Sequence, residues 1–127
     1  MKKAIENSLQ YSEIIKTLKA DVLVEDTNPN RKMHAVISSD LISDILTFLE
    51  EDALLLTGLV NTQVIRVAEM IDIGSIILVR GKKPERPMIE MAREKNVPLA
   101  TTNHTLYEAS GKLYKRGLKS CTYNREG

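Results

Sequence analysis

The fold is decided by the segment ALLLTGLVNTQVIRVAEMIDIGSIILV, which spans residues 53–79. It opens with the apolar run 53–56 and closes with the apolar run 76–79. Each run is too short for a helix, and a strand that is apolar at every position is typical of a parallel sheet buried on both faces. Between the runs, apolar residues repeat at the spacing of one helix face: Val64, Val67, Ala68 and Ile71. The segment therefore predicts a strand, a helix and a second strand.

The pattern continues toward the C-terminus. A third apolar run covers 97–100, and the three runs recur about every 22 residues, the length of a strand, a helix and two short loops. A helix with Pro84 or Pro87 near its start is predicted from Met88, Ile89, Met91 and Ala92. Another is predicted from Leu106, Ala109, Ser110 and Leu113, with a capping box at Thr105 and Glu108 and an end at 115–117.

The first third of the chain completes the prediction. Ser12 is expected to cap a helix that carries Ile14, Ile15 and Leu18, and strands are expected at 22–24 and 35–38. A further helix follows, with apolar positions Ile42, Ile45, Leu46 and Leu49. We expect one α/β domain with a mainly parallel sheet of about five strands, in the order α-β-β-α-β-α-β-α-β-α. Its expected bounds are 12–118, between an N-terminal extension (1–11) and a flexible C-terminal tail (119–127).

Composition excludes several classes of protein. Eighteen basic and seventeen acidic side chains leave a net charge of +1, whereas nucleic-acid binders usually carry a basic excess. No apolar run is long enough to span a membrane, and the N-terminus lacks the apolar core of a secretory signal. A single cysteine excludes an intrachain disulfide. We expect a cytoplasmic protein without a nucleic-acid or membrane partner.

Several stretches resemble the DRTGG domain family across roughly 12–118. They are 30–35, 38–44, 56–61 and the strand 77–79 with Gly81 and Pro84 after it. In the eponymous motif only Arg31 matches strictly, because Asn30 replaces the acid and His34, Ala35 and Val36 stand where small residues or glycines are usual. Members of the family occur alone, beside CBS domains or inside phosphotransacetylases, and are similar in fold to the N-terminal domain of HPr kinase/phosphorylase. The resemblance implies a regulatory or ligand-sensing module, often dimeric, without established catalysis.

Ligands of parallel sheets bind at the carboxyl ends of the strands. The loops expected there are polar, and suit an anion such as the phosphate of a metabolite or nucleotide. Their residues are Ser38, Ser39, Asp40, Thr57, Gly58, Asn61, Thr62, Arg80, Gly81, Thr101, Thr102, Asn103 and His104. The alternative is that these Ser, Thr and Asn residues only cap helices and that Gly58 only forms a turn.

No dinucleotide or P-loop motif follows any strand, and neither histidine has a metal-ligand partner at useful spacing, so we expect no metal and no resident cofactor. His104 with Glu108, or Asp40, would be needed for a phosphotransferase-like activity, but no set of nucleophile, base and orienting group is recognisable. We therefore expect a non-catalytic sensor of a small anion, acting through a protein partner. The alternatives are a dimerisation module without a ligand and, third, an enzyme. A homodimer is expected to use apolar residues in polar surroundings: Leu59, Val60, Tyr107 and Tyr114.

Overall fold

A six-stranded sheet forms the centre of the protein. The computed structural model describes residues 8–28, 30–48 and 50–123 of the 127-residue chain. The strands lie in the order β2-β7-β6-β5-β4-β8, and all neighbours are parallel except β2, which is antiparallel to β7. Their bounds are β2 Asp21–Val24, β4 Ala35–Ser38, β5 Leu54–Thr57, β6 Ser75–Leu78, β7 Leu99–Thr101 and β8 Lys119–Ser120. A separate antiparallel pair joins β1 (Leu9–Gln10) to β3 (Lys32–Met33).

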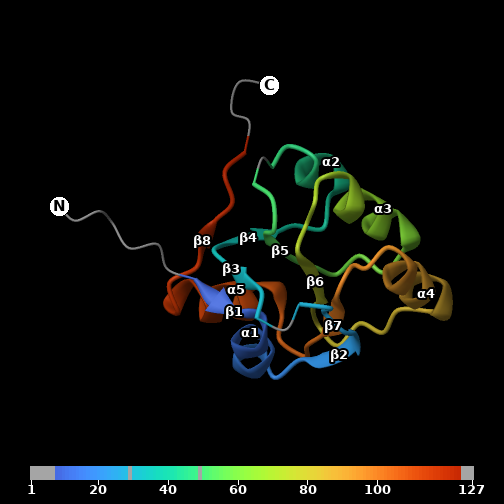
Figure 1. Cartoon of the computed structure of the whole chain (residues 1–127). Coiled ribbons are helices and arrows are strands. Elements are labelled where there is room, and N and C mark those ends of the chain that lie inside the picture. The colour runs from blue at the N-terminus through green and yellow to red at the C-terminus, as the bar shows by residue number, and fades with distance from the viewer. Residues whose placement is uncertain (1–7, 29, 49, 124–127) are drawn as a thin grey trace.

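Helices cover both faces of the sheet (Figure 1). On one face lie α2 (Ile42–Ile45), α3 (Thr62–Met70) and α4 (Arg86–Glu94); on the other lie α1 (Tyr11–Leu18) and α5 (Leu106–Lys115). Side chains alternate between two cores, so Leu55 packs toward α3 whereas Leu54 and Leu56 pack toward α1 and α5. Every position of β5 and β6 is buried, which is why both strands are apolar almost throughout.

The predicted α/β class and mainly parallel sheet are confirmed, and the local signals for two helices are confirmed as well. Thr105 and Glu108 form the capping box of α5, and Pro87 lies in the first turn of α4. α5 ends at Lys115, and Gly117 adopts a φ of 103°, a conformation that glycine reaches without steric cost.

Two details of the prediction are wrong. Ser12 does not cap α1, because the helix begins at Tyr11 and its N-cap is Gln10, whose backbone N–H donates a hydrogen bond to the Glu13 carboxylate. The helix expected after β4 is the single turn α2, and Leu49 lies outside the described residues. The sheet has six strands, close to the five or so expected, and the additional one is β8, formed by residues just after α5.

Some residues of the ranges predicted as an extension and a tail take part in the fold. Leu9 and Tyr11, in the range expected to be an extension, belong to the buried cluster that also contains residues of α1 and α5. Lys119–Ser120 pairs with β4, and the N–H of Cys121 donates to the carbonyl of Val36 at 3.0 Å. This pairing satisfies backbone groups of β4 that would otherwise form an exposed edge. Residues 1–7 and 124–127 lie outside the described residues.

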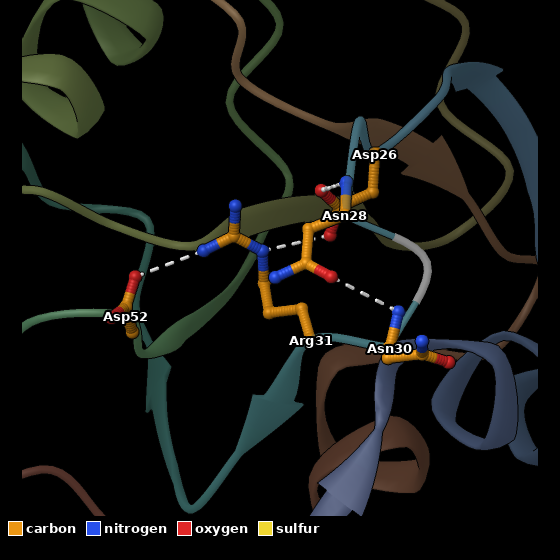
Figure 2. A network of polar contacts seen from close by, with 5 residues as sticks. All are labelled: Asp26, Asn28, Asn30, Arg31 and Asp52. Carbon is orange, nitrogen blue, oxygen red and sulfur yellow. Dashed lines mark hydrogen bonds and ion pairs between the residues drawn. The ribbon is translucent and has the colours of Figure 1, made fainter.

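Arg31, the one strictly matching residue of the degenerate motif, ties two loops together at the amino ends of β4 and β5. Its Nε donates to Asp26 Oδ2 at 2.8 Å and its Nη1 donates to Asp52 Oδ1 at 3.0 Å (Figure 2). The Asp26 carboxylate is only 3% exposed, and its other oxygen accepts from the N–H of Asn28. A carboxylate removed from water in this way requires a charged partner. We call this arrangement the Arg31 clasp.

Replacing Arg31 by alanine should lower the free energy of unfolding by about 1–3 kcal/mol, because the Asp26 carboxylate stays buried without its cation. Urea denaturation followed by circular dichroism measures the change. Arg66→Ala on the exposed face of α3 is the matched control and should stay within about 0.5 kcal/mol of the parent. A loss no larger than that of the control would mean that the clasp does not stabilise the fold.

Candidate functional site

The carboxyl ends of β4, β5, β6 and β7 lie at one edge of the sheet, because these four strands are parallel. The loops that leave this edge hold nearly all the residues predicted to form a ligand site. Some of these side chains form hydrogen bonds that hold the loops of the fold together. Others form no such bond within the described residues and are therefore available to a ligand.

Asp40 connects the loop after β4 to the loop after β5. Its Oδ1 accepts a 2.6 Å hydrogen bond from the N–H of Gly58 and a 3.1 Å hydrogen bond from the hydroxyl of Thr57. Thr57 is fully buried, and its hydroxyl also accepts from the N–H of Leu59. Nearby, the Ser39 hydroxyl accepts from the N–H of Leu41. Asp40, Ser39 and Thr57 therefore build the loops of this edge.

The loop after β6 reverses direction through two consecutive left-handed residues, Arg80 at φ 60° and Gly81 at φ 64°. The N–H of Arg80 donates to the carbonyl of His104 at 2.7 Å, and the N–H of Gly81 donates to the carbonyl of Thr102 at 2.8 Å. Glycine is favoured at position 81, because a side chain at this φ is strained and its Cβ would lie 2.8 Å from Asn103 Oδ1. A positive φ at a non-glycine residue persists only when surrounding bonds hold it.

This reversal directs the Arg80 side chain across the strand ends toward the loop after β5. Arg80 Nη2 lies 3.1 Å from the point where a Cβ on Gly58 would be, and the Asp40 carboxylate lies 3.5 Å from the same point. Within the described residues Arg80 forms no ion pair, and its side chain is exposed. A cation is thus positioned over Gly58 without a carboxylate that neutralises it directly.

Most of the remaining predicted residues support the fold. Asn61 caps α3 by accepting from the N–H of Val64, and Thr62 begins that helix. Thr101 donates to the carbonyl of Lys82 at 2.8 Å. The buried Thr102 hydroxyl donates to the carbonyl of Leu18 at 2.6 Å, which joins this edge to the end of α1. Asn61 is thus a helix cap, as the structural alternative expected, whereas Thr101 and Thr102 cap no helix N-terminus and instead join neighbouring segments through backbone carbonyls.

His104 and Glu108 are the neighbours expected from the sequence. His104 Nδ1 lies 3.7 Å from Glu108 Oε1, and Glu108 also accepts from the N–H of Thr105 at 2.9 Å. The hydrogen bond from the Thr105 backbone is the main reason that the pKa of Glu108 lies below its ordinary value. Glu108 is therefore ionised at neutral pH, and its hydrogen bond belongs to the capping box of α5, which is a structural role.

Ser38 does not join the other predicted residues. Strand alternation turns it to the α5 face, where its hydroxyl lies 2.7 Å from the hydroxyl of Ser110. There it lines a groove of about 860 Å³ between α5 and the β4–β8 side of the sheet, with Tyr107 and Tyr114 on the α5 side. The two tyrosines were expected from the sequence to contribute to a dimer contact, whereas the groove could not be foreseen, since residues of β8 line it as well.

Three further observations concern the molecule outside this site. Among residues 8–28, 30–48 and 50–123, no three His, Cys, Asp or Glu side chains lie close enough to hold a metal ion. Burial raises the pKa of the Cys121 thiol to about 11, so this cysteine is a neutral thiol at physiological pH. The described helices include none with the length and apolar character needed to cross a membrane.

Comparison with known proteins agrees with this fold. A profile of the DRTGG domain matches residues 13–115. One similar solved structure contains the CBS and DRTGG domains of the regulatory region of Clostridium perfringens pyrophosphatase, complexed with the activator diadenosine tetraphosphate. The TM-score is 0.67 and the sequence identity is 18%, over 91% of this chain and 51% of that chain. This chain thus spans about half the length of that one. No curated protein sequence matches significantly.

The matched segment begins in the first turn of α1 and ends with the last residue of α5, so it contains five of the six strands of the central sheet. The family resemblance predicted from the sequence is therefore confirmed, and the chain belongs to the DRTGG domain family.

Proposed function

We propose that this protein is a non-catalytic regulatory domain that binds a small anionic, phosphate-bearing ligand at the carboxyl ends of the strands. The observation that carries the proposal is the exposed Arg80 guanidinium, which lies over Gly58 with no ion-pair partner among the described residues. The left-handed backbone at Arg80 and Gly81 and its two hydrogen bonds hold the cation in that direction. A prepositioned guanidinium suits a phosphate, which it can bind through two parallel hydrogen bonds.

The comparisons support a regulatory role. The pyrophosphatase domains of similar fold come from a regulatory region and were solved with a nucleotide activator. The contacts at the strand ends also favour binding over catalysis, since Asp40 accepts two hydrogen bonds from its own loops and His104 faces a capping glutamate. The proposal keeps the cytoplasmic location expected from the sequence, where a lone cysteine remains a thiol.

Arg80→Ala should weaken the binding of pyrophosphate, or of whichever phosphate-bearing metabolite raises the melting temperature in a screen, by about 1.5–3 kcal/mol. The reason is the loss of one charge-assisted contact. Calorimetry on the full chain measures the affinity. Gly58→Ala is a second variant and should weaken binding less than Arg80→Ala, because its Cβ would lie 3.1 Å from Arg80 Nη2 and shift that flexible side chain by a few tenths of an ångström.

Arg66→Ala removes an exposed arginine of α3 and is the matched control for charge. It should leave the affinity unchanged. Equal affinity in the parent, Arg80→Ala and Gly58→Ala, with the circular dichroism spectrum intact, would exclude Arg80 from the ligand site.

We also propose that the domain is a homodimer, through the edge that carries Arg80. Leu41 and Val60 follow the ends of adjacent strands and are 56% and 41% exposed, which is unusual for two large apolar residues on one edge. Leu59 is instead half-buried against the core cluster around α3, so of the two loop residues expected at the contact Val60 is the available one. A dimer contact beside the ligand site would let a bound anion change the contact.

Light scattering at micromolar concentration should give about twice the 14.3 kDa mass of one chain. Leu41→Asp combined with Val60→Asp should return the mass to that of one chain, because two buried carboxylates per protomer oppose association. Met70→Asp is the matched control, since Met70 is 69% exposed at the far end of α3. A parent protein that stays monomeric at every concentration contradicts the dimer and leaves the ligand proposal to its own test.

A further inference from the structure

The groove beside α5 is distinct from the strand-end site. α5 packs on β4 and β5, and Val36 and Ser38 of β4 line the groove together with Phe48. The groove has a volume of about 860 Å³, within the range of small-molecule sites. Arg80 does not line it.

The α5 wall of the groove contains two exposed rings with a gap between them. Tyr107, Gly111 and Tyr114 lie four and three residues apart, which places them on one face of the helix. The two tyrosines are 88% and 78% exposed, and a Cβ built on Gly111 meets no atom within 4 Å. Glycine in the middle of a helix is unfavourable, so helix stability does not explain why glycine stands at position 111. Its missing side chain leaves open space between the positions of the two tyrosines. A planar group fits such an opening and can contact the rings.

The charged residues that line the groove are mostly lysines and favour an anionic occupant. Lys112, Lys115 and Lys119 line it, and within the described residues none of the three forms an ion pair. The acidic residue in the lining, Glu108, is already hydrogen-bonded to Thr105 in the capping box. A second copy packed here by a two-fold axis would bring lysines against lysines, which disfavours self-association. An anion is favoured instead.

We propose that this groove binds a nucleoside phosphate, with the base against the rings at Gly111 and the phosphates near Lys112, Lys115 and Lys119. The paired hydroxyls of Ser38 and Ser110, 2.7 Å apart, lie in the same groove and can hydrogen-bond the sugar. This site does not depend on Arg80, so it stands or fails separately from the site at the strand ends.

Calorimetric titration of the full chain with ATP and with tripolyphosphate tests the proposal, because only ATP has a base. ATP should bind at least about fivefold more tightly, the scale of one base stacked on an aromatic ring. Gly111→Leu should abolish this preference and leave the melting temperature equal or higher, since leucine favours helix and fills the opening. Tyr107→Ala, at an exposed position that the core does not use, should also reduce the preference. Lys16→Leu, at an exposed position of α1, is the control for an added leucine and should retain the preference.

The proposal also predicts that Arg80→Ala retains the preference for ATP over tripolyphosphate. Four results would overturn it: no preference in the parent at millimolar ligand, a preference that survives in Gly111→Leu with the fold intact, loss in Arg80→Ala alone, or a changed mass of Gly111→Leu in light scattering. The third would assign the nucleotide to the strand ends and support the proposed function. The fourth would identify the groove as a contact between two copies.

Discussion

Burial of β5 and β6 on both faces is the constraint on which the rest of the molecule depends. The polar backbone of a strand in this position can be satisfied only by strands on either side, and its side chains only by a helical layer above and below. Parallel neighbours in turn need helical crossovers, so each strand must end in a loop that enters a helix. The polar loops at the carboxyl ends of the strands therefore arise because the chain must pass from each strand into a helix. Most of their hydrogen bonds hold these loops in place.

The central strands of the sheet could be predicted from the sequence, whereas the strands at its two edges were predicted less completely. Leu54–Thr57 and Ser75–Leu78 were predictable as strands because nearly every residue is apolar, a pattern that few other structures need. Lys119–Ser120 was not, because two exposed polar residues carry no strand signal and their pairing with β4 is set by distant parts of the chain. The direction of β2 was equally hidden, since alternation of side chains is the same in parallel and antiparallel strands.

The candidate site divides in the same way. The placement of Arg80 just after β6 and next to glycine predicted a side chain that crosses the strand ends, and its Nη2 lies 3.1 Å from the point where a Cβ on Gly58 would be. By contrast, Thr102 was predicted to face a ligand but donates to the carbonyl of Leu18, a residue far away in sequence. Ser38 was assigned to the strand ends and faces the α5 groove, because only the register of β4 decides which side of the sheet it takes. Tertiary contacts of this kind leave no local pattern.

The pairing of β8 with β4 has a consequence for how the chain folds. β4 lies near the beginning of the described chain and β8 at its end, so their ladder closes one of the longest loops in the molecule. Closing a long loop is entropically unfavourable, and the contacts of β8 offset this cost best once the intervening strands have assembled. Until β8 docks, β4 is an open edge whose unpaired amides are available to another chain. β8 covers this edge of the sheet, and conditions that delay its docking would favour aggregation of an otherwise assembled domain.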